Sequence, residues 1–171
     1  MQMTKIDNIA AEITAVREKW HTKNHPFFRM MLDGSLDLHA LGIYMASHYK
    51  FVELALPSFG FLLWKGPQDV KHAVIEEEGL VAIPRPGHEP HDHSRMIFDF
   101  CTAAGLSDDE VKSLDIGPAW HGRRLHYVQT LRDEALGVIL AMQATQEGQQ
   151  PALNKEVTIP SLTAHYGFTA Q

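Results

Sequence analysis

The sequence has very little cysteine and no long, uninterrupted apolar run. Cys101 is the only cysteine among 171 residues, so no internal disulfide can form, and a reducing, cytoplasmic location is expected. The most apolar stretch, residues 41–64, is interrupted by His48, Lys50 and Glu53. A membrane-spanning helix needs about 20 nearly continuous apolar residues. This stretch therefore predicts a buried helix and no membrane association.

Positive charge is also scarce. The chain has 15 lysines and arginines against 21 aspartates and glutamates, a net charge of −6 with histidine counted as neutral. A surface of this sign does not favour nucleic acid or an anionic membrane as a partner. The first residues also lack the basic region and apolar core that mark a secretory signal.

Strand patterns are nearly absent, whereas helical spacing recurs along the chain. The first expected helix, capped by Asp7 or Asn8, places apolar side chains four, three and four residues apart: Ile9, Ile13, Val16 and Trp20. The longest apolar-periodic segment runs over residues 37–63, where Pro57 should kink or break the helix. Similar spacing follows over residues 67–78, 93–104 and 118–146. These patterns predict an all-α fold, a bundle of about six helices in a single domain over residues 1–171.

Two local signals mark where helices begin. His25 precedes Pro26, so the first helix should stop there and His25 should brace the first turn of a short helix over residues 27–32. Ser107 followed three residues later by Glu110 is a capping-box pattern. Between the helices, residues 80–90 are rich in proline and predict a loop.

The order of several motifs resembles the heme-oxygenase-like family of TenA-like (thiaminase II) and PqqC-like (pyrroloquinoline-quinone synthase) proteins. The likeness covers nearly the whole chain. It is carried by His25-Pro26-Phe27, Asp33-Gly34-Ser35-Leu36, Tyr44 to Phe51, Glu76-Glu77-Glu78-Gly79, His93 to Ser107, Glu147, Pro151 and His165-Tyr166-Gly167-Phe168. The resemblance implies a heme-oxygenase-like bundle with a small-molecule site among its central helices.

The resemblance implies three possible chemistries, and two of them lack a key residue here. TenA-like enzymes have a Gln-Asp-Tyr motif where this chain has His48 between a serine and a tyrosine, so the pyrimidine-binding aspartate is missing. Cys101 also aligns poorly with their cysteine nucleophile. PqqC-like enzymes have Asp-His-Asp-Gly where this chain has residues 76–79, Glu-Glu-Glu-Gly. Thiamin-pyrimidine hydrolysis and cofactor-free oxidation of a quinone precursor therefore stand as alternatives.

The third chemistry is that of the CADD-like di-iron oxidases and oxygenases. Their pattern implies iron ligands at Glu77 or Glu78, at His93 and at Glu147. Carboxylates and imidazoles are the ligands that non-heme iron favours. A final helix carrying His-x-x-x-Asp-x-x-His would lie beyond Gln171, so the expected ligand set is incomplete.

These observations lead to one preferred function and two alternatives. The preferred hypothesis is a non-heme iron oxidase or oxygenase, with one iron or two, that acts on a small organic molecule. Tyr44, His48 and Tyr127 are the expected substrate-pocket residues, although packing in the core would explain Tyr127 equally well. The alternatives are a cofactor-free PqqC-like or thiaminase-like TenA enzyme, and a non-catalytic bundle that binds a ligand or partner. The wider family suggests a homodimer.

Overall fold

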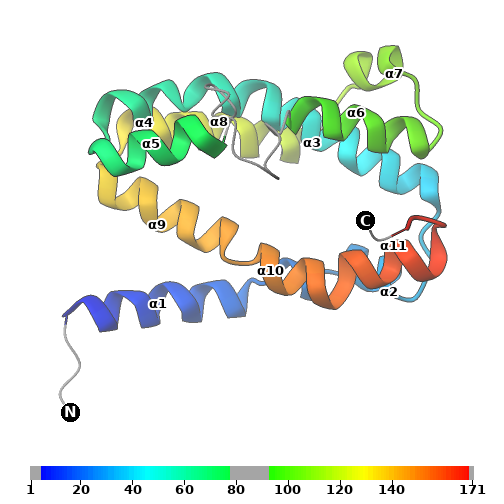
Figure 1. Cartoon of the computed structure of the whole chain (residues 1–171), viewed down its shortest axis with the longest axis horizontal. Helices are drawn as coiled ribbons and strands as arrows, with labels where there is room; N and C mark the ends of the chain where they lie inside the picture. Colours follow the sequence, from blue (N-terminus) through cyan, green and yellow to red (C-terminus); the bar gives the residue numbers. More distant parts are fainter. Residues whose placement is uncertain (1–4, 78–92, 170–171) are drawn as a thin grey trace, which may run out of the picture. The chain divides into compact units, whose positions relative to one another are not determined.

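The computed structural model describes residues 5–77 and 93–169, which form helices, turns and connecting segments without a strand (Figure 1). The predicted all-α fold is confirmed. Six of the described helices have ten or more residues: α1 (Lys5–Lys19), α3 (Leu38–Ser58), α5 (Gln68–Glu77), α6 (His93–Ala103), α8 (Pro118–Asp133) and α9 (Leu136–Glu147). None of the described helices is both long enough and apolar enough to cross a membrane. The chain divides into two compact units, residues 38–136 and residues 1–37 with 137–171.

Helix α3 is the centre of the unit formed by residues 38–136. It packs against α6, α8 and the short helix α7 (Asp108–Ser113), and Figure 1 shows α6 in green lying along α3 in cyan. Its buried side chains include Leu41, Phe51 and Val52. Helix α4 (Gly60–Lys65) packs against α5 in the same unit.

A glycine allows α3 to approach the end of α6 closely. A Cβ atom at Gly42 would lie 2.9 Å from both the Cβ of Ala104 and the Cδ1 of Leu106, closer than real carbon contacts. The Cys101 thiol donates to the Gly42 carbonyl oxygen at 3.7 Å across the same contact. The absence of a side chain at residue 42 is therefore a packing requirement.

Two helix boundaries test predictions made from the sequence, one from Pro57 and one from the apolar spacing over residues 118–146. Helix α3 ends at Ser58, directly after Pro57, and α4 begins at Gly60, so the predicted break is confirmed. The single helix predicted over residues 118–146 is wrong, because α8 ends at Asp133 and α9 begins at Leu136.

Lys65 explains why α8 ends where it does. Its Nζ donates to the carbonyl oxygens of Leu131 at 3.1 Å and Glu134 at 3.2 Å, and also to that of Arg132. The last carbonyls of a helix have no partner within the helix, and a cation there also interacts favourably with the helix dipole. Lys65 thus caps α8 and ties α4 to it.

In the other unit, the N-terminal segment contains α1, a 3-10 turn (Thr22–Asn24) and α2 (Pro26–Leu32). The Nδ1 atom of His25 accepts a hydrogen bond from the Phe27 backbone N–H at 3.2 Å, which confirms its predicted bracing role. The predicted cap at Asp7 or Asn8 is wrong. Helix α1 already includes Lys5, so both residues lie inside it.

The C-terminal part of this unit is more helical than expected. α9 is followed by α10 (Gln150–Leu153), a π-helical turn (Asn154–Thr158) and α11 (Ile159–His165). The π-helical turn packs against α2. The Tyr166 hydroxyl donates to the Leu36 carbonyl oxygen at 2.8 Å, which ties the two ends of the unit together. Gly34, in the turn after α2, has a φ of 73°, a conformation that favours glycine.

Candidate functional site

The strongest candidate site is a group of aromatic and charged side chains between α3 and α8. Positions 44, 48 and 51 are four and three residues apart and therefore share one face of α3; positions 120, 123 and 127 do the same on α8. The two helices pack against each other. We call this group the aromatic cluster, and its members are Tyr44, His48, Phe51, Trp120, Arg123 and Tyr127.

Phe51 lies at the centre of the aromatic cluster. The Tyr127 ring meets it edge-on with centroids 4.9 Å apart, and the His48 ring stacks nearly parallel to it at 5.9 Å. The Arg123 guanidinium carbon lies 3.9 Å from the Phe51 ring centroid. A cation over a ring face at this distance is attracted by the negative face of the ring. A phenol, an imidazole and a guanidinium therefore surround the buried phenyl ring of Phe51.

Trp120 connects the remaining members. Its ring lies 6.0 Å from that of Tyr44 in an edge-on arrangement, and the Arg123 guanidinium lies 5.1 Å from its centroid. Burial raises the pKa of the Tyr44 phenol, and the positive charge of Arg123 opposes part of that change. Tyr44 is consequently a neutral phenol at physiological pH, able to donate a hydrogen bond.

The structure thus brings the three predicted pocket residues into one cluster. Tyr127 is only 5% exposed, while Tyr44 and His48 are half-buried. Their role as pocket residues stays a prediction. The sequence analysis did not select Arg123, and it placed Trp120 only within the apolar-periodic segment 118–146. The spacing of 120, 123 and 127 on one face of α8 was the available signal.

The predicted metal ligands lie on α5, α6 and α9 or outside the described residues. Glu78 lies outside them, and only the backbone is described for Glu77, the last residue of α5, and His93, the first of α6. Glu147 ends α9 in the other unit, where it is exposed and its Oε1 accepts from the Gln146 amide at 3.4 Å. Among residues 5–77 and 93–169, no three metal-capable side chains form a group. The iron ligands therefore stay predictions.

Cys101 is a fully buried thiol on α6. Its side chain is 0% exposed, its sulfur donates to the Gly42 carbonyl, and burial raises the pKa of the thiol. The thiolate is the nucleophilic form of cysteine, so this environment disfavours nucleophilic chemistry at Cys101.

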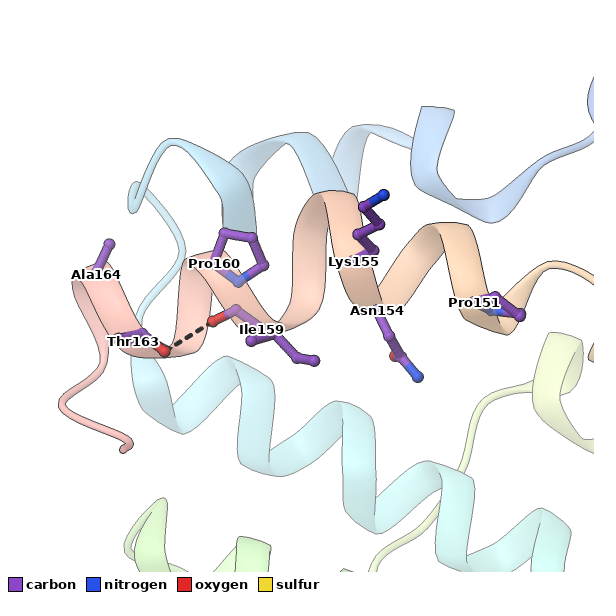
Figure 2. A pocket seen from close by; sticks show the side chains of 7 residues that line it. All are labelled: Pro151, Asn154, Lys155, Ile159, Pro160, Thr163 and Ala164. Carbon is purple, nitrogen blue, oxygen red and sulfur yellow. Dashed lines mark hydrogen bonds between the residues drawn. The ribbon is translucent and has the colours of Figure 1, made fainter. Parts of the chain in front are cut away.

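A hollow lies on the unit formed by residues 1–37 and 137–171. It is an open groove of about 570 Å³ along α10, the π-helical turn and α11 (Figure 2). Its walls are mainly apolar, with Asn154 and Lys155 as polar members; the remaining lining residues are Pro151, Ile159, Pro160, Thr163 and Ala164. Figure 2 shows the hydroxyl of Thr163 turned back to its own helix, where it donates to the Ile159 carbonyl at 3.0 Å. No sequence signal predicted this groove.

A match to a protein-family model shows which family the chain belongs to. The model of the TENA/THI-4/PQQC family matches residues 13–150. The chain belongs to this family. A search of the curated proteins found no match.

The TENA/THI-4/PQQC match includes both helices that carry the aromatic cluster, since α3 and α8 lie inside residues 13–150. It stops before the lining residues of the groove, which begin at Pro151. The match therefore covers the helices of the aromatic cluster and stops short of the groove.

Proposed function

We propose that the chain is a TenA/PqqC-type enzyme that binds a small aromatic heterocycle at the aromatic cluster and transfers protons to or from it. The observation that carries this proposal is the arrangement around Phe51, where a guanidinium, an imidazole and a phenol converge between α3 and α8. Ligand sites of this kind combine apolar and aromatic walls with a few convergent polar groups.

Each side chain has a distinct role in this proposal. Ring faces such as that of Trp120 stack on a planar substrate. Tyr44 donates a hydrogen bond from its neutral phenol, and Arg123 attracts an anionic substituent. His48 exchanges protons with the bound ring, because histidine is the side chain best suited to acid–base catalysis near neutral pH.

The buried state of Cys101 directs the proposal toward acid–base rather than covalent chemistry. A nucleophile must reach the substrate and carry a base or a lowered pKa. The Cys101 side chain is 0% exposed and its thiol pKa is raised. His48 is therefore the group to which the proposed chemistry is assigned.

A second candidate function is the non-heme iron oxidase or oxygenase. It is favoured by the order of two helices along the chain: α5 carries Glu77 and α6 carries His93, the order expected for a carboxylate and an imidazole ligand. Iron bound by Glu77 or Glu78, His93 and Glu147 would supply dioxygen activation. The aromatic cluster would then bind the organic substrate of that reaction.

Isothermal titration calorimetry with thiamin and pyrroloquinoline quinone as probes tests the proposed function. Protein freed of metal with a chelator should bind one of them saturably. His48→Ala and Arg123→Met should each weaken binding at least tenfold, whereas Leu125→Ala, at an exposed position of α8, should leave it unchanged. Equal affinity in all four proteins would contradict the assignment of the site.

The metal content of protein produced with iron distinguishes the second candidate. Near-stoichiometric iron that disappears in a His93→Ala, Glu147→Ala variant would favour the oxidase. A metal-free protein that still binds a heterocycle would favour the acid–base enzyme.

A further inference from the structure

Two histidines four residues apart each cap the segment that follows them. The Nδ1 atom of His21 accepts a hydrogen bond from the Lys23 backbone N–H at 3.2 Å, at the start of the 3-10 turn. The Nδ1 atom of His25 accepts from the Phe27 backbone N–H, also at 3.2 Å, at the start of α2. The first N–H groups of a helix have no carbonyl partner within it, so each imidazole takes the place of the side-chain oxygen that usually accepts from them.

The acceptor role fixes the protonation state of both rings. A neutral imidazole carries its hydrogen on one nitrogen and accepts at the other, whereas an imidazolium donates from both. His21 and His25 are therefore neutral in this arrangement, with the hydrogen on Nε2. A proton taken up from solvent at Nδ1 would place two donors against each other and break the hydrogen bond. Histidine is the side chain whose ordinary titration lies between about pH 5 and 8.

The 3-10 turn between the two histidines connects the N-terminal segment to the C-terminal part of its unit. The Thr22 backbone N–H and hydroxyl both donate to the Gln149 side-chain oxygen, each at 2.7 Å. The Lys23 ammonium donates to the Glu156 carboxylate at 2.9 Å. All three bonds start from residues that lie between the two caps, so a turn that has lost its caps would hold these bonds less well.

The charges around the turn do not favour a protonated ring. The titratable side chains on the adjoining and contacting segments are mostly cationic: Arg17, Glu18 and Lys19 in the last turn of α1, Lys23 in the 3-10 turn, Arg29 on α2, Lys155 and Glu156 in the π-helical turn, and His165 on α11. Both carboxylates among them already have a cationic partner, which is Arg17 for Glu18 at 3.7 Å and Lys23 for Glu156. An added imidazolium would therefore gain little from them.

His25 is expected to be the more acid-sensitive of the two caps. A positive charge at the start of α2 opposes the helix dipole, whose positive end lies there. His21 is close enough to Glu156 to act on it: the hydrogen bond from Lys23 is the main cause of the lowered pKa of Glu156, and the charge of His21 contributes less. Glu156 therefore offsets part of the cost of a charge at His21, and α2 should lose its cap first.

We propose that His21 and His25 make this turn an acid-sensitive junction: protonation of the two imidazoles releases both caps and loosens the bonds of the turn to Gln149 and Glu156. The junction regulates the order of the N-terminal segment and not the proposed chemistry. The aromatic cluster lies on α3 and α8, in the unit formed by residues 38–136, and shares none of these residues. The acid response and ligand binding can therefore be measured separately.

The tautomers of the two rings test the junction in the wild type alone. At about pH 7.5, above the ordinary titration range of histidine, the nitrogen chemical shifts of both imidazoles should place the hydrogen on Nε2. A hydrogen on Nδ1 of either ring would overturn the caps on which the junction depends.

Amide hydrogen exchange of the full chain, followed by NMR, tests the acid response. Between about pH 7.5 and about pH 5.5, the protection of the Lys23 and Phe27 N–H groups, relative to an unstructured peptide at the same pH, should fall about threefold or more, the size of a lost helix cap. The double variant His21→Asn, His25→Asn keeps capping oxygens that do not titrate, so its protection should stay constant. His121→Asn, at an exposed position of α8, should respond like the wild type. Equal protection of the wild type at both pH values, or an equal fall in the double variant, would overturn the proposal.

Discussion

Helices α3 and α1 both carry a regular apolar face, yet only the face of α3 contains buried side chains. α3 buries side chains such as Leu41, Phe51 and Val52 against α6 and α8. α1 buries none of its residues. Periodicity therefore indicates which residues share a face, but it does not indicate what the face packs against.

The comparison also shows where the proposed ligand site lies relative to the core. On α3 the same face that builds the core carries Tyr44 and His48, so the proposed ligand site is part of the packing between helices. On α1 the apolar face contributes no buried residue to its unit. Substitutions of apolar residues should therefore affect stability more on α3 and its neighbours than on α1.

The largest expected effect comes from emptying the core beside α3. Leu131 on α8 is 0% exposed, and Leu131→Ala should lower the free energy of unfolding by about 2–5 kcal/mol, since a cavity is left behind. Ile9→Ala on α1, at a position 50% exposed, should change it by less than about 1 kcal/mol. Urea denaturation measures both. Equal losses of unfolding free energy in the two variants would contradict the difference between the buried core beside α3 and the exposed face of α1.

A smaller effect is expected from filling the contact between α3 and α6. Gly42→Ala adds a Cβ that meets Ala104 and Leu106, and should destabilise the fold by about 1–3 kcal/mol. Gly122→Ala on α8 is the control, because nothing lies within 4 Å of its added Cβ. It should stabilise the helix by about 0.5–1 kcal/mol. Thermal unfolding of both variants compares them, and a stabilising Gly42→Ala would contradict the close contact.

The cap that Lys65 provides at the end of α8 should contribute about as much to the stability of the fold as other helix caps. Lys65→Met removes the ammonium from three terminal carbonyl oxygens but keeps the aliphatic stem. We expect a loss of about 1–2 kcal/mol, the range for hydrogen bonds from a charged group. Amide hydrogen exchange should show faster opening of the last turn of α8. Unchanged exchange there would show that the cap is not needed.

The smallest effect should appear on acidification, at the exposed start of α7. Two hydrogen bonds with Ser107 lower the pKa of Glu110 in the folded chain from its ordinary value of 4.5. A depressed carboxyl pKa contributes stability above the unfolded value, and that contribution is lost as pH falls through the folded value. The stability of the wild type should thus fall slightly more than that of Glu110→Gln below pH 4.5. Parallel acid titrations of the two proteins would contradict this.

The features that the sequence predicted correctly depend on neighbouring residues. The His25 brace, the break after Pro57 and the capping box at Ser107 all arise within a few positions along the chain. The end of α8 was missed because its cap comes from Lys65, 66 residues before Leu131. Neither residue 134 nor residue 135 is a glycine or a proline, so the apolar spacing in the sequence gives no sign of the break between α8 and α9.

The candidate site was predictable only in part for the same reason. Tyr44, His48 and Tyr127 could be selected because they lie on helices with apolar faces. Arg123 shares a face of α8 with Tyr127, but its place over Phe51 depends on how α8 packs on α3. The iron ligands depend on helix ends and on Glu147, which lies in the other unit, and stay predictions.

The most direct test of the central claim is tryptophan fluorescence. A Trp20→Phe, Trp64→Phe variant retains only Trp120, the tryptophan of the aromatic cluster. Titration with thiamin and with pyrroloquinoline quinone should change its emission saturably for at least one probe, and His48→Ala in the same background should abolish that response. An emission that neither probe changes, or an equal response with His48→Ala, would contradict the assignment of the aromatic cluster as the ligand site.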